Sequence, residues 1–212
     1  MPTNLKERGA NVNHILKNKY KNAKCSLDYK NPLELLVATM LSAQCTDERV
    51  NKVTVPLFEK YKTAKDYANA PLEELEQAIH STGFYRNKAR AIKNSCAEIV
   101  KKHGGKVPAT MDELVTLAGV GRKTANVVLG NVYGEQAIVV DTHMGRVAQR
   151  LGLTKEKKPE KIEKDLMLVI PQNEWTAFSH RVILLGRGVC SARKPDCRQC
   201  PFNDFCPSAQ HL

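Results

Sequence analysis

No stretch of this sequence is long and apolar enough to cross a bilayer as a helix, which takes about 20 consecutive apolar residues. Residues 1–8 are charged and no hydrophobic run follows them, so we expect no signal peptide. The composition also lacks the glycine and proline repeats of collagen and the bias of a low-complexity chain. These absences predict a folded protein of the cell interior with no membrane anchor.

Acidic side chains are scarce relative to basic ones. The 212 residues contain 22 Asp and Glu against 33 Lys and Arg, which gives a formal net charge of +11. Apolar residues make up 42% of the chain, enough for a real core in one large domain or two small ones. A positive field of this size attracts polyanions, and nucleic acid is the commonest such partner inside cells. The alternative is a basic charge that serves solubility alone.

Strand patterns are also scarce, whereas helix patterns recur. Residues 31–41 begin with an Asn-Pro cap and continue with apolar residues at helical spacing. Pro56 is expected to kink or split the helix that contains it. The strand-like run at 137–140 is too short to found a sheet and predicts a buried extended connector. Further helix starts are expected at Thr63, Pro71 and Thr110. The predicted fold class is all-α.

A longer helix is predicted for residues 84–103, because its apolar residues repeat at helical spacing and Gly104-Gly105 would end it. Its buried face is expected to hold Ile92, Cys96, Ile99 and Val100.

The most informative segment, residues 117–125, predicts a helix, a tight glycine turn and a second helix. Gly119 and Gly121 let the backbone turn sharply and approach another surface, and the amides at the start of the next helix can bind a phosphate. A dinucleotide fingerprint would need a preceding strand and a third glycine, and a P-loop would need four residues between its glycines. A purely structural turn remains the alternative.

Lys123 falls in the first turn of that second helix, beside Arg122. The helix dipole and the neighbouring cation both disfavour an ammonium group there, and a neutral amine can form a Schiff base. Pairing with a phosphate is an equally good interpretation. Asp141 follows the predicted connector and could stabilise a cationic sugar transition state, or could simply cap the next helix.

The cysteines are unevenly distributed along the chain. Cys25, Cys45 and Cys96 stand among apolar neighbours and are expected to be buried as small hydrophobic side chains. A four-cysteine group near the end predicts a metal site, either zinc or a [4Fe–4S] cluster. Arg193 and Lys194 lie within this segment and would face a phosphate backbone. The four expected ligands are Cys190, Cys197, Cys200 and Cys206.

Four elements together resemble endonuclease III, a family of DNA repair glycosylases in the helix-hairpin-helix superfamily. They are residues 41–47, residues 117–124, residues 140–143 and the Cys-x6-Cys-x2-Cys-x5-Cys pattern. The similarity runs from Asn31 to Cys206.

The resemblance implies two helical domains that flank a DNA-binding cleft. Residues 25–135 would form a six-helix domain with the helix-hairpin-helix motif. Residues 1–24 and 136–212 would form a second domain with a [4Fe–4S] cluster on the four cysteines.

The resemblance also assigns roles to single residues. Lys123 and Asp141 match the catalytic lysine and aspartate, and Gln44 matches the residue that fills the gap left by a flipped base. Phe84 stands at a wedge position usually held by leucine, and Ala118 replaces the usual proline of the hairpin. Further DNA contacts are implied for Gly119, Val120, Gly121, Arg122, His143, Arg193 and Lys194.

The implied activity is removal of oxidised pyrimidines from duplex DNA, followed by β-elimination at the abasic site through a lysine Schiff base. A monofunctional mismatch glycosylase and a non-catalytic DNA-binding protein are the alternatives. The expected partner is double-stranded DNA with damaged pyrimidines or abasic sites, bound by a monomer. The expected location is the cytoplasm, with the nucleoid if the source is bacterial.

Overall fold

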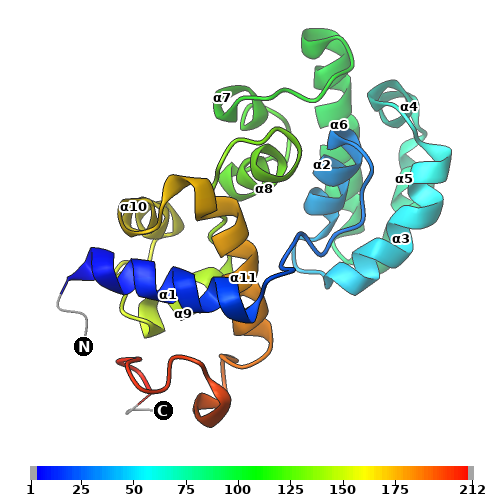
Figure 1. Ribbon diagram of the computed structural model, residues 1–212. Helices are drawn as coiled ribbons and strands as arrows, with labels where there is room; N and C mark the ends of the chain where they lie inside the picture. Colours follow the sequence, from blue (N-terminus) through cyan, green and yellow to red (C-terminus); the bar gives the residue numbers. More distant parts are fainter. Residues whose placement is uncertain (1–3, 210–212) are drawn as a thin grey trace. The chain divides into compact units, whose positions relative to one another are not determined.

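The computed structural model describes residues 4–209, and its regular elements in that range are all helices (Figure 1). The predicted all-α class is therefore confirmed. Cys25–Glu135 forms one compact unit, and the segments before and after it together form the other. Each unit has its own apolar core. Within residues 4–209, no helix combines the length and apolar character that a membrane crossing requires.

The unit Cys25–Glu135 is a stack of helices around buried leucine, isoleucine and valine side chains. Its helix α2 packs against α3, α6 and α8, and α6 also contacts α4 and α5. The elements in chain order are α2 (Pro32–Leu41), α3 (Asp47–Lys60), α4 (Ala64–Asn69), α5 (Leu72–Ala78), the 3-10 turn η1 (His80–Thr82), α6 (Tyr85–His103), α7 (Met111–Leu114) and α8 (Arg122–Val132).

Polar caps start several of these helices where the sequence predicts them. The side chain of Asn31 accepts a hydrogen bond from the amide of Glu34, and Thr63 and Asp66 form a reciprocal capping box. At the C-terminal end of α6, Gly104 takes the left-handed conformation that ends this helix.

The structure corrects three expectations in this unit. Helix α3 is not split at Pro56, because Pro56 is exposed and water can reach the carbonyl that loses its partner. Val100 is 36% exposed rather than buried on α6. Cys25 and Cys45 are half-buried, and only Cys96 fits the expectation, because it is fully buried. Burial raises the pKa of the Cys96 thiol to about 12.

The other unit joins both ends of the chain. Helix α1 (Leu5–Lys19) packs against α10 (Pro159–Val169) and α11 (Trp175–Arg187), and α11 also contacts α9 (Thr142–Arg150) (Figure 1). The 3-10 turns η2 (Gln172–Glu174) and η3 (Cys197–Gln199) complete its regular elements among the described residues.

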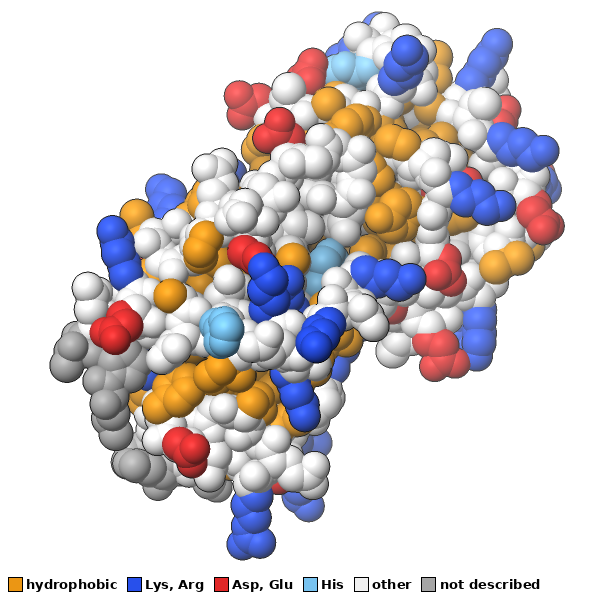
Figure 2. All heavy atoms as spheres, viewed as in Figure 1, with side chains coloured by type: hydrophobic (Ala, Val, Ile, Leu, Met, Phe, Trp, Pro, Cys, Tyr) orange, Lys and Arg blue, Asp and Glu red, His pale blue; other side chains and the backbone are white. Residues whose placement is uncertain are grey.

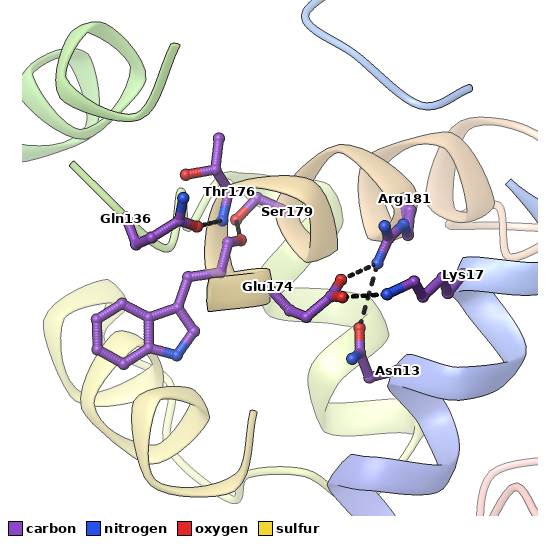
Figure 3. A network of polar contacts seen from close by, with 8 residues as sticks. Asn13, Lys17, Gln136, Glu174, Thr176, Ser179 and Arg181 are labelled. Carbon is purple, nitrogen blue, oxygen red and sulfur yellow. Dashed lines mark hydrogen bonds and ion pairs between the residues drawn. The ribbon is translucent and has the colours of Figure 1, made fainter. Parts of the chain in front are cut away.

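A polar network ties α1 to α11 (Figure 3). The Glu174 carboxylate accepts hydrogen bonds from Lys17 Nζ at 2.5 Å and Arg181 Nη1 at 2.6 Å. Arg181 Nη1 also lies 3.4 Å from Asn13 Oδ1. Burial tends to raise the pKa of the Glu174 carboxyl, but the hydrogen bonds and charges of Lys17 and Arg181 outweigh it and lower that pKa.

Glu174→Gln is expected to lower the free energy of unfolding at pH 7 by about 2 kcal/mol, because it removes a mostly buried charged acceptor. A lowered carboxyl pKa stabilises the fold above the unfolded value, about 4.3, and this contribution disappears as the pH falls through the folded pKa. Urea unfolding from pH 7 to pH 3 should therefore show the wild-type and variant curves converging in acid. Glu48→Gln removes only an exposed pair with Lys52 and should change little. Equal losses in the two variants would contradict this prediction.

Candidate functional site

The glycine hairpin lies between α7 and α8. Leu117 and Val120 are buried in the core of their unit, and the Val120 amide donates to the Leu117 carbonyl at 3.1 Å. Gly119 has φ +74°, and a Cβ there would lie 2.7 Å from the Cβ of Ala91 on α6. Gly119 is therefore required by both the backbone conformation and the packing of the turn.

Gly119→Ala is expected to lower the free energy of unfolding by about 2–4 kcal/mol, from left-handed strain and the clash with Ala91. Gly121→Ala is the matched control. Gly121 has φ −93°, and apart from its own chain neighbours no atom of the described residues lies within 4 Å of the position that an added Cβ would take. Its substitution should change unfolding in urea by less than about 0.5 kcal/mol. A Gly119→Ala protein as stable as the control would show that the hairpin relaxes freely.

Helix α8 begins with its amides free of any side-chain cap. Gly121 is the N-cap residue and has no side chain that could accept from these amides. Arg122 and Lys123 follow in the first turn and are both exposed. Outward amides, the positive end of the helix dipole and two basic side chains together favour an anion at this point.

Gln44 and Phe84 each have a strained backbone conformation. Among the described residues, they are the two residues other than glycine with positive φ, at 53° and 48°. Such conformations cost about 1–3 kcal/mol and occur mainly where the surroundings enforce them, often at functional sites. Both side chains are exposed, and Phe84 is 63% accessible. A large apolar ring held in solvent by a strained turn is suited to entering another molecule.

Each of these two turns is held by local contacts. The Gln44 turn follows α2 and is closed by a hydrogen bond from the Cys45 amide to the Ser42 carbonyl at 3.1 Å. Beside Phe84, the rings of His80 and Tyr85 lie 4.4 Å apart between centroids. The sequence alone indicated neither strained conformation.

Asp141 is the N-cap of α9, and its Oδ1 accepts from the Met144 amide at 2.7 Å. In the connector that leads to it, Ala137, Ile138 and Val139 are buried, as predicted, and Val140 is half-buried. The amides of this connector donate to side chains of α11 instead of to the backbone of a paired strand. The amide of Ala137 donates to the Thr176 hydroxyl and that of Val139 to the Ser179 hydroxyl, and both acceptors are drawn in Figure 3. Capping occupies one carboxylate oxygen of Asp141.

Two arginines on α9 hold the cysteine segment in place. Arg146 Nη2 donates to the Gly186 carbonyl at 2.8 Å and the Cys190 carbonyl at 3.0 Å, and lies 3.3 Å from His143 Nδ1. Arg150 Nη1 donates to the Ser191 carbonyl at 2.7 Å. The sequence prediction missed both arginines, although their i, i+4 spacing behind Asp141 places them on one helix face.

The four C-terminal cysteines line one cavity. Burial raises the pKa of Cys200, and the thiols of the other three raise it further. Among residues 4–209, no three His, Cys, Asp or Glu side chains converge tightly enough to hold a single metal ion. Exposed Arg193 and Lys194 lie in the loop between the first two cysteines. The lining residues are Arg150, Leu151, Leu185, Val189, Cys190, Pro195, Asp196, Cys197, Cys200, Asn203, Cys206 and Ala209.

Lys and Arg side chains are spread over the face seen in Figure 2, with acidic side chains among them. The net charge is therefore not gathered into one patch in this view, and the site is defined by particular residues. The structure brings Gln44, Phe84 and the hairpin into one unit, and places Asp141, His143 and the four C-terminal cysteines in the other.

Comparisons with known proteins agree over nearly the whole chain. The family model described as HhH-GPD superfamily base excision DNA repair protein matches residues 37–172. Endonuclease III of Synechocystis sp. is 55% identical over 206 residues, covering 97% of this chain and 94% of that protein. Endonuclease III of Bacillus subtilis is 49% identical over 192 residues, covering 90% and 88%. A solved structure of a trapped endonuclease III-DNA covalent intermediate, an estranged-adenine complex, matches with a TM-score of 0.95, 48% identity and coverage of 100% and 99%.

Proposed function

Because the chain belongs to the HhH-GPD superfamily of base excision DNA repair proteins, we propose that it removes oxidised pyrimidines from duplex DNA and cleaves the strand at the resulting abasic site. The predicted class of enzyme, a base-excision DNA glycosylase with AP lyase activity, is confirmed by the endonuclease III relatives.

The strained, exposed turns of Gln44 and Phe84 carry the proposal. A glycosylase must take its target base out of the stack, and the vacated space must be filled for the extruded state to persist. Gln44 offers an amide that can hydrogen-bond the estranged base, and Phe84 offers a ring that can stack between base pairs. The uncapped amides of α8, with Arg122, hold the phosphate backbone beside them.

Lys123 supplies the nucleophile. Its Nζ bonds to C1′ of the deoxyribose as the bond from C1′ to the base breaks, and the base departs with the electron pair and a proton. The C1′–O4′ bond of the sugar then breaks, O4′ takes up a proton, and the protonated imine that forms between Lys123 Nζ and C1′ acidifies the C2′ hydrogen. Loss of that proton expels the 3′ phosphate. Asp141 stabilises the cationic sugar through the carboxylate charge.

The cysteine cavity fits a [4Fe–4S] cluster better than zinc. A single zinc ion holds its sulfurs at about 2.3 Å, which would require the thiols to converge on one point. Cys190, Cys197, Cys200 and Cys206 instead line one cavity and form no single-ion site among the described residues, which is compatible with a larger cluster held by four thiolates. When bound, such a cluster supplies structural cross-linking of the loop that carries Arg193 and Lys194. Iron and sulfide analysis should find about four of each per chain.

All residues assigned to the reaction belong to this one chain, and we expect a monomer to act on each lesion. The DNA partner is a duplex that contains a damaged pyrimidine or an abasic site. Exposed Arg193 and Lys194 add phosphate contacts that weaken as salt rises. His143 supports α9 through Arg146 and lies two residues from Asp141.

Strand cleavage of matched duplexes tests the proposal. Three duplexes of one sequence carry thymine glycol, a G:T mismatch or no lesion, and each is incubated with and without a later alkali step. We expect the thymine glycol strand to be cleaved without alkali and the other two to stay intact. Cleavage of the mismatch strand only after alkali would establish a monofunctional mismatch glycosylase. Binding of all three duplexes without base release would establish a non-catalytic protein.

A further inference from the structure

Lys88, one turn into α6, is 7% exposed, which is unusual for a lysine. Its Nζ donates to the Leu41 carbonyl at 2.8 Å and to the Thr82 carbonyl at 2.8 Å. One ammonium group therefore joins two segments that are 41 positions apart in the chain.

The two acceptors are the last residues before the strained turns. Leu41 ends α2, three residues before Gln44, and Thr82 ends η1, two residues before Phe84. Carbonyls at helix ends lack the partners that the helix interior provides. The Lys88 ammonium satisfies both of them and so links the start of one turn to the start of the other.

The buried charge has a cost that packing alone would not require. Burial lowers the pKa of Lys88, whereas the nearby Cys45 thiol acts in the opposite direction. An apolar side chain of similar length could fill the same space without a desolvation penalty. The contribution specific to lysine is the pair of hydrogen bonds to the two turns.

We propose that Lys88 is a positioning residue that fixes the Gln44 turn relative to the Phe84 turn, so that both side chains enter the DNA together at an extruded base. This inference rests on the proposed function, because it assigns Gln44 and Phe84 to the same event. A Cβ added at Gly119 of the hairpin would lie 2.7 Å from Ala91 Cβ and 3.3 Å from Met40 Cε, and both residues are close in sequence to a partner in the link. The phosphate-binding turn thus packs on the same two helices that the Lys88 link holds.

The chain offers a matched control on the same helix. Lys93 Nζ also donates to two carbonyls, those of Ala68 at 2.8 Å and Ala70 at 2.5 Å, at the end of α4. Lys93→Met removes the same kind of bond without touching either strained turn. The comparison of Lys88→Met with Lys93→Met therefore separates positioning from general stability.

The measurement is the dissociation constant for a duplex with a tetrahydrofuran abasic analogue and for the same duplex without it. Lys88→Met should weaken binding of the abasic duplex by about 10–100-fold and leave the undamaged duplex within about twofold. Lys93→Met should leave the ratio of the two constants unchanged. If Lys88→Met folds poorly, Lys88→Gln keeps an uncharged NH2 donor group on a shorter side chain and should give an intermediate ratio.

A double-mutant cycle gives the second readout. In a protein that already carries Gln44→Ala and Phe84→Ala, Lys88→Met should change the ratio by less than about twofold, because Lys88 acts through those side chains. The same loss in both backgrounds, or an unchanged ratio in Lys88→Met, would overturn the positioning role. A wild-type protein that binds both duplexes equally would instead overturn the proposed function, and the inference with it.

Discussion

The Lys123→Ala protein is expected to form no covalent adduct when it is incubated with abasic duplex and borohydride. Borohydride reduces the imine between Nζ and C1′ to a stable amine, so the adduct reports the nucleophile directly. Without this amine, strand cleavage should fall by about 10³-fold or more, the scale seen when a nucleophile is removed. Denaturing gels of wild type and variant give both quantities.

Arg122→Ala is the matched control, because Arg122 precedes Lys123 in the same exposed first turn of α8. It should weaken DNA binding and still form the adduct at saturating protein. An adduct that persists in Lys123→Ala would move the nucleophile to another amine. Loss of the adduct in both variants would mean that the turn, rather than the lysine amine, is what the reaction needs.

The Asp141→Asn protein is expected to lose about 10²–10⁴-fold in the rate of base excision while keeping the wild-type stability. Asparagine caps helices as well as aspartate does, so the hydrogen bond to the Met144 amide survives the substitution. Only the negative charge that would stabilise the sugar cation is lost. Single-turnover excision of thymine glycol and urea unfolding separate the two effects.

Asp141→Ala removes the cap as well and should lower the free energy of unfolding by a further 0.5–2 kcal/mol, roughly the range measured for lost N-caps. Both variants should be equally slow if the charge is what matters. An active Asp141→Asn protein beside an inactive, destabilised Asp141→Ala protein would reduce Asp141 to a helix cap.

Helix starts were predictable from the sequence because each depends on a few adjacent residues. Asn31, Thr63 and Thr110 accept from amides three residues later, and this geometry follows from residue type and spacing alone. The burial of the connector at 137–140 was also predictable from adjacent residues, because this short run is entirely apolar. Its hydrogen bonds were not, since the acceptors Thr176 and Ser179 come from a distant helix.

The strained turns were beyond sequence reasoning. Nothing in the residue types Gln44 or Phe84 favours positive φ, because the left-handed region is unfavourable for both. The two turns are joined by the Lys88 link, whose partners lie 47 and 6 residues away, and the longer of these contacts depends on the tertiary fold. The resemblance identified the two positions, and the structure added the conformation that sets them apart from other exposed side chains.

Two predictions about helices were wrong because local exposure to water differed from what the sequence pattern indicated. Val100 continues the apolar spacing of α6 but is exposed near the end of that helix. Pro56 fits inside α3 because its side of the helix faces water. Periodicity predicts the mean direction of a helix face, and it does not show where the neighbouring elements stop covering that face.

The pairing of α1 with α10 and α11 has a consequence for the order of folding during synthesis. Helix α1 is made first, but its partner helices follow only after the whole unit Cys25–Glu135. At about 5–20 residues per second, making that unit takes roughly 5–20 s, during which α1 has none of these partners. On the ribosome, the unit that holds Gln44, Phe84 and Lys123 is therefore complete before the unit that holds Asp141 and the four cysteines.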